Sequence, residues 1–137
     1  MTDAHPEQTA PVGADVPLIS NQNVMMNISL IKEYHENWTK AQTQAFVSAG
    51  LERLGMSHIA NRRNPALTAE ERFCAMLLRA AMIRNALIVI DRPFQIFPHL
   101  QDATFLLGAL DGISDLFMRC FILDYCWMKD KYGALCR

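Results

Sequence analysis

The segment from Leu67 to Phe94, LTAEERFCAMLLRAAMIRNALIVIDRPF, constrains the fold of this chain more than any other segment. Thr68 and Glu71 have the spacing of a capping box, in which each side chain satisfies a backbone N–H at the start of a helix. We therefore predict a helix that begins after Thr68 and runs to about Arg84. The apolar run Leu87–Ile90 that follows predicts a strand buried on both faces, as in a parallel sheet.

Patterns elsewhere in the chain predict mainly helices. Asn23 can cap a helix over about 24–34, and Thr39 begins a second helix that ends at Gly55. Further helical segments are expected over the ranges 57–61, 101–113 and 125–132. Residues 117–123 fit either a strand or the start of a helix, and the pattern does not separate the two.

Residues 1–17 hold four proline or glycine residues among small and polar ones, which is typical of a flexible arm. We therefore expect a flexible N-terminal arm over 1–17 and a single domain over 18–137. The chain has 137 residues, of which 51% are hydrophobic and 20% charged, and this composition suffices for one buried core.

The charge and hydropathy of the chain exclude several classes of partner. The net charge is −1 and no basic stripe is present, so we expect no nucleic-acid partner. Apolar runs such as Ala86–Ile90 are far shorter than the ~20 residues that span a bilayer, so no direct membrane insertion is expected. The N-terminal residues lack the apolar stretch of a signal peptide, which predicts a cytoplasmic protein.

The segment 67–94 resembles, without a gap, the region of ABC transporter-type ATPases that runs from the signature helix to the Walker B strand. The family pattern opens with Leu-Ser-Gly-Gly-Gln, continues through a helix containing Ala-Arg-Ala-Leu, and ends in an apolar strand followed by Asp-Glu-Pro. Arg79 stands at the arginine of that helix. A weaker likeness continues through 18–28 and 50–62, so the resemblance covers about residues 18–125.

The resemblance implies a mostly α fold with a small parallel β element, an α/β remnant of the P-loop NTPase fold. In this interpretation the helical subdomain occupies 18–84, and 85–137 is the C-terminal part of the core, which contains the Walker B half.

The signature positions that contact nucleotide in the family are changed here. Thr68 stands for a serine that meets the γ-phosphate, and Ala69 and Glu70 stand for two glycines. A carboxylate at Glu70 would oppose a phosphate ~4 Å away by about 1 kcal/mol in water and ~4 kcal/mol at an effective dielectric near 20. Glu70 and Glu71 also fit a structural role, since carboxylates in a first turn stabilise the helix dipole.

At the Walker B position, Asp91 matches the aspartate that helps to hold Mg²⁺, and it is the candidate metal ligand. A carboxylate there can instead cap the next turn or pair with Arg92 or Arg84. Arg92 occupies the position of the catalytic glutamate, and a guanidinium has no acceptor with which to take a proton. The family's Walker A loop has no counterpart in the sequence, its Q-loop glutamine falls near Ala14, and we predict no catalytic residue.

These departures predict a degenerate ABC-ATPase-like protein that does not hydrolyse ATP by itself. In the family the helical subdomain docks on a coupling helix of the transmembrane subunit, so retaining it implies an accessory or regulatory partner of an ABC transporter. The expected partners are a permease or ATPase subunit, or a second copy of this chain. The expected location is cytoplasmic, peripheral at the inner face of the membrane through a transporter.

Three alternatives remain open on the sequence. The chain is a helical interaction or sensor module unrelated to transport, half of a split and active ATPase, or the product of a decayed gene. No cofactor is expected for the chain alone, and Mg-ATP is expected only if a partner supplies Walker A.

Overall fold

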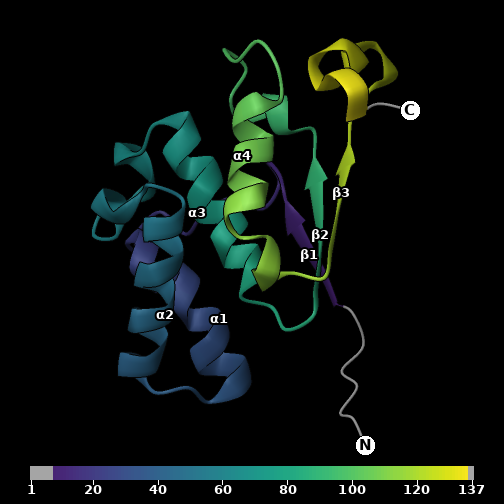
Figure 1. Ribbon diagram of the computed structural model, residues 1–137. Coiled ribbons are helices and arrows are strands. Elements are labelled where there is room, and N and C mark those ends of the chain that lie inside the picture. Colours follow the sequence, from purple (N-terminus) through teal and green to yellow (C-terminus); the bar gives the residue numbers. More distant parts are fainter. Residues whose placement is uncertain (1–7, 136–137) are drawn as a thin grey trace, which may run out of the picture.

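The computed structural model describes residues 8–135, and Figure 1 shows its helices gathered on one side of a small sheet. The sheet has three parallel strands in the order β1-β2-β3: β1 (Gln8–Val12), β2 (Ala86–Asp91) and β3 (Arg119–Leu123). The α-helices of the described chain are α1 (Val24–Glu36), α2 (Lys40–Arg53), α3 (Ala69–Ala81) and α4 (Thr104–Gly112). A kinked 3₁₀ segment, η5 (Cys126–Leu135), follows β3.

The order of the strands explains why the helices share one face. Crossovers between parallel strands are almost always right-handed. Because strand order follows chain order, both crossovers place their helices on the same side of the sheet, as Figure 1 shows. The face under the helices forms the core, where five side chains are at most 1% exposed: Ala10, Val12, Ala86, Ile88 and Ile90.

The opposite face of the sheet is open. Side chains alternate between faces along a strand, and Phe121 and Leu123 on this face are 50% and 53% exposed. Their neighbours Leu87 and Val89 on β2 are half-buried. The prediction that β2 is buried on both faces is therefore wrong for this face, because no helix of residues 8–135 covers it.

The expected arm over 1–17 is wrong for residues 8–12, which form β1, while residues 1–7 lie outside the described residues. Pro11 misled the interpretation because proline is normally excluded from a sheet. It is tolerated here since β1 is an edge strand, whose outer N–H groups have no ladder partner. Ala10 and Val12 alternate with exposed Thr9 and Pro11, which is the pattern of a strand with one covered face.

The predicted helices are confirmed, with small changes at their ends. Asn23 accepts a hydrogen bond from Met26 N at 2.8 Å and caps α1. Thr39 caps α2, and Gly55 follows that helix with φ +71°, a conformation that favours glycine. α3 ends at Ala81 rather than Arg84, because the turn into β2 begins there.

Residues 119–123 form a strand, which settles the ambiguity over 117–123. No helix within the described residues has both the length and the apolar character needed to cross a bilayer.

Candidate functional site

The carboxyl ends of the three parallel strands meet at one edge of the sheet, where α/β proteins commonly bind ligands. Gly13 follows β1 and lies directly against β2. A Cβ added to Gly13 would stand 3.3 Å from both Cβ and the carbonyl oxygen of Asp91. The close approach of the two strands therefore favours glycine at this position.

The Asp91 carboxylate at this edge is held by its neighbour in the chain. Arg92 donates to Oδ1 from Nε at 3.2 Å and to Oδ2 from Nη2 at 3.1 Å. Arg92 also donates to the Tyr125 hydroxyl at 3.1 Å, and its guanidinium lies 3.9 Å from the Asp15 carboxylate. The hydrogen bonds to Asp91 and then to Tyr125 raise the pKa of Arg92, so its positive charge is fixed at this edge.

The pairing with Arg92 engages the Asp91 oxygens that a metal ion would need. Both oxygens of Asp91 already accept hydrogen bonds from a guanidinium, which competes with a metal ion for the same lone pairs. Residues 8–135 contain no group of three or more His, Cys, Asp or Glu side chains that could hold a metal ion. The assignment of Asp91 as a metal ligand stays a prediction.

The amino end of α3 is the second predicted site, and its capping box is formed as expected. Glu71 N donates to Thr68 Oγ1 at 3.2 Å, and Thr68 N donates to the Glu71 carboxylate at 2.9 Å. Glu71 also lies 2.8 Å from Nε2 of His58 and 3.6 Å from the guanidinium of Arg62. The Thr68 N–H and then His58 lower the pKa of Glu71, so the carboxylate is a structural anion.

Glu70 lies one residue earlier and is held separately. Its carboxylate lies 3.2 Å from Nε2 of His99, and this hydrogen bond is the main cause of its lowered pKa. The amino end of a helix normally attracts anions, but the first turn of α3 already carries the carboxylates of Glu70 and Glu71. Ala69, the other residue that stands for a family glycine, is half-buried. The assignment of Thr68, Ala69 and Glu70 to nucleotide binding stays a prediction.

Comparisons with known proteins give a clear result for the fold alone. No model of a known protein family matches the chain, and no curated protein matches it. A solved ATP-binding cassette, in a dimeric post-hydrolysis state bound to ADP and Pi, matches with a TM-score of 0.61 at 14% identity. That match covers 87% of this chain and 53% of the other.

A second structure, described as a metal-chelate type ABC transporter in an inward-facing conformation, matches with a TM-score of 0.63 at 20% identity. That match covers 86% of this chain and 49% of the other. The fold is ABC ATPase-like. This chain spans about half the length of the two chains that it matches.

Within this ABC ATPase-like fold, the two predicted nucleotide-facing groups belong to different interaction networks. Thr68 and Glu70 are tied to helix capping and to His99, whereas Asp91 is tied to Arg92. Arg79 has a structural role: it donates to the Pro17 carbonyl at 3.0 Å and also to the Val16 carbonyl, and so holds the segment after β1 against α3.

A groove that the sequence interpretation missed runs between α1, β1 and the end of α3. One part has a volume of about 290 Å³ and is mostly apolar. Its lining residues are Ala10, Pro11, Val16, Ile19, Asn27, Leu30, Ile31, Arg79, Ala80 and Ile83. Leu30 and Ile31 of α1 are only partly buried where they line it.

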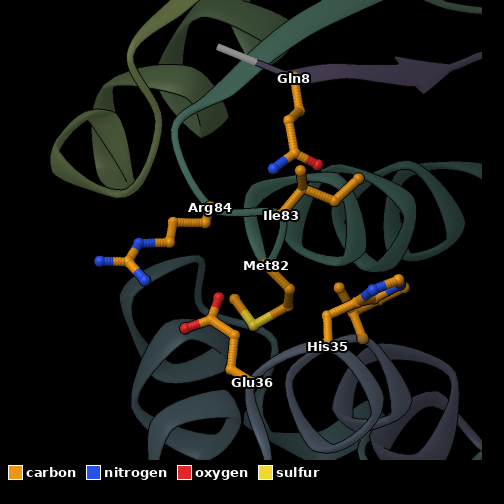
Figure 2. A pocket seen from close by; sticks show the side chains of 7 residues that line it. Gln8, His35, Glu36, Met82, Ile83 and Arg84 are labelled. Atoms are coloured by element: carbon orange, nitrogen blue, oxygen red, sulfur yellow. The ribbon is translucent and has the colours of Figure 1, made fainter. Parts of the chain in front are cut away.

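A second hollow of about 220 Å³ adjoins the first, since both are lined by Ile31 and Ile83. Figure 2 shows the residues that line it, with labels on Gln8, His35, Glu36, Met82, Ile83 and Arg84. Glu36 is paired with Lys32 at 2.9 Å. The two hollows together form an open groove, apolar near Ile31 and polar near His35 and Arg84, which we call the α1 groove.

Proposed function

We propose that this ABC ATPase-like chain does not hydrolyse ATP by itself and acts through protein contacts as an accessory or regulatory partner of an ABC transporter. The observation that carries the proposal is the α1 groove, where side chains of α1, β1 and the end of α3 leave a hollow that is apolar in one part and polar in the other. The proposal places the chain at the membrane surface through its partner.

The shape of the groove favours a protein partner over a small ligand. Small-molecule sites are clefts or cavities that enclose most of the ligand's surface. The two hollows, of about 290 and 220 Å³, are open along one side, and they suit the projecting side chains of a partner helix. A helix in a groove anchors itself through residues one turn apart. Ile31 and Ile83, which line both hollows, are the expected contacts.

The charged side chains at the predicted nucleotide-binding positions support the same proposal, because they already pair with one another or with neighbouring residues. Asp91, Arg92 and Glu70 are each engaged by a neighbouring side chain. Binding ATP there would require these pairs to separate and would bring phosphate toward carboxylates. Protein contact at the α1 groove requires no such rearrangement.

Photo-crosslinking tests the groove. A benzophenone amino acid at Ile31 should capture a subunit of an ABC transporter in the native cell. The same probe at Glu52, an exposed position on α2, is the control and should not. Equal capture from both positions, or capture of no transporter subunit from Ile31, would contradict the proposal.

An activity assay tests the lack of turnover. The double substitution Glu70→Gly and Arg92→Glu restores the family residues at two changed positions, yet the purified chain should still show no Mg-ATP hydrolysis. The physical reason is that the Walker A residues that hold the phosphates have no counterpart in this sequence. Phosphate release above the background of a mock purification would refute this expectation.

A further inference from the structure

The α1 groove follows one face of α1. Asn27 and Ile31 line its apolar hollow, and Ile31 and His35 line its polar one. Residues four positions apart lie on the same side of an α-helix, so these three side chains form a line along α1. From Asn27 to His35 this line is ~12 Å long, or about two helical turns. The groove therefore has the length and the direction to receive about two turns of another helix.

The charged side chains of the groove leave an excess of positive charge. Glu36 lines its polar end, but Lys32 already binds the Glu36 carboxylate at 2.9 Å. Arg84 lines the same end (Figure 2), is exposed, and forms no ion pair within residues 8–135. At the apolar end, Arg79 donates to backbone carbonyl oxygens and not to a carboxylate. The groove is thus complementary to a partner that carries a carboxylate.

The position of the polar end along α1 favours one orientation of the partner. This end lies at the carboxyl end of α1, since Glu36 is the last residue of the helix. A partner helix antiparallel to α1 places its first turn beside Arg84. The helix dipole favours acidic side chains in a first turn and disfavours them in a last turn. An antiparallel helix can therefore present a carboxylate to Arg84 without a loss of its own stability.

We propose that the α1 groove binds an amphipathic helix of a partner protein, antiparallel to α1. Aliphatic side chains one turn apart enter the apolar hollow beside Ile31 and Ile83, and a carboxylate from the first turn pairs with Arg84. This inference rests on the proposed function, because it specifies the partner of the same groove. It adds the charge and the direction of the helix that the groove selects.

Fluorescence anisotropy with the purified full chain and two labelled peptides tests the proposal. Both peptides are alanine-based helices with blocked ends and leucine residues one turn apart. They differ only in whether two glutamates stand in the first turn or in the last. The chain should bind the first-turn peptide about threefold more tightly, which is the size of effect expected for an exposed ion pair. Because the two peptides have the same composition and net charge, nonspecific attraction to the chain cancels.

Variants of the chain identify the side chain responsible. Arg84→Glu should remove the preference, whereas a preference caused by the helicity of the peptides themselves would persist in this variant. Lys129→Glu is the matched control, because it makes the same change of charge at an exposed residue of η5 that does not line the groove. Its affinities should follow those of wild type. Ile31→Asn should weaken both peptides by a similar factor, and circular dichroism should show that each variant is folded.

Three results overturn the inference: no binding of either peptide at millimolar concentration, equal affinity of wild type for both peptides, or a preference that persists in Arg84→Glu. The proposed function is judged separately, by photo-crosslinking from Ile31. Capture of a transporter subunit together with equal peptide affinities refutes only the inference, whereas a peptide preference without such capture refutes only the transporter partner.

Discussion

The two faces of the three-stranded sheet are built from the same strands and similar side chains, yet they have different environments. On the face under the helices, Ile88 and Ile90 are fully buried. On the other face, Phe121 and Leu123 remain about half exposed. The difference arises from the order of the strands, because both crossovers return on the same side. Topology, and not residue type, decides which of these side chains enters the core.

The unequal burial of the two faces of the sheet affects how much their side chains contribute to stability. Fully burying a large aliphatic or aromatic side chain contributes roughly 1.5–3 kcal/mol to folding. Side chains on the covered face contribute this full amount to the stability of the fold. Side chains on the open face contribute less, because they remain about half exposed. The same kind of substitution should therefore destabilise the protein more on the covered face than on the open face.

The largest effect is expected from Ile88→Ala on the covered face. It should reduce the free energy of unfolding by about 2–5 kcal/mol, because it leaves a cavity in a packed core. Leu123→Ala on the open face should cost less than about 1 kcal/mol, since half of its surface is already exposed. Urea unfolding at low protein concentration measures both values, and equal losses would break the distinction between the faces.

A smaller loss of stability is expected from removing the N-terminal cap of α3, the helix that packs on β1 and β2. Thr68→Ala removes the cap of α3 and should cost about 1 kcal/mol. Thr39→Ala removes the equivalent cap of α2, which packs mainly on α1 and α3, and it should cost less. The Thr68 cap also orients Glu71 toward His58. Thermal unfolding compares the two variants, and a larger loss from Thr39→Ala would contradict this ranking.

The smallest effect is a change in the pH dependence of stability. Hydrogen bonds from Thr68 N and then His58 lower the pKa of Glu71 below its usual value of 4.5. The carboxylate therefore contributes stability above about pH 4.5, and this contribution is lost as pH falls through the lower pKa of the folded state. Glu71→Gln should have a lower Tm at pH 6 and a smaller further decrease on acidification.

The control for this titration is Glu52→Gln, an exposed position on α2. Its Tm between about pH 3 and pH 6 should follow that of wild type. If Glu71→Gln loses as much stability on acidification as wild type does, protonation of Glu71 does not cause the loss of stability at low pH.

Local signals made most of the fold predictable. The caps at Asn23, Thr39 and Thr68 depend on side chains within three residues of the backbone groups that they satisfy, so the sequence alone indicates them. β1 was missed because its pairing partner, β2, is distant in sequence and because Pro11 argues against a strand unless the strand is known to lie at an edge.

The candidate site was predictable only where partners are close in sequence. The pairing of Asp91 with Arg92 was one of the alternatives that the sequence allowed. The contacts of Arg92 with Tyr125 and of Glu70 with His99 join residues about thirty positions apart, and no local pattern indicates them. The α1 groove was missed for the same reason, because it exists only where α1, β1 and α3 meet.

The parallel pairing of β1 with β2 also bears on how the chain reaches its folded state. Gln8 is in register with Ala86, so β1 leaves the ribosome long before the strand that it must join has been made. Contacts between such distant residues form slowly, since a large loop must close first. During synthesis, β1 exposes unpaired backbone groups and the apolar Ala10 and Val12, and this interval is when the nascent chain is most exposed to aggregation and most open to chaperones.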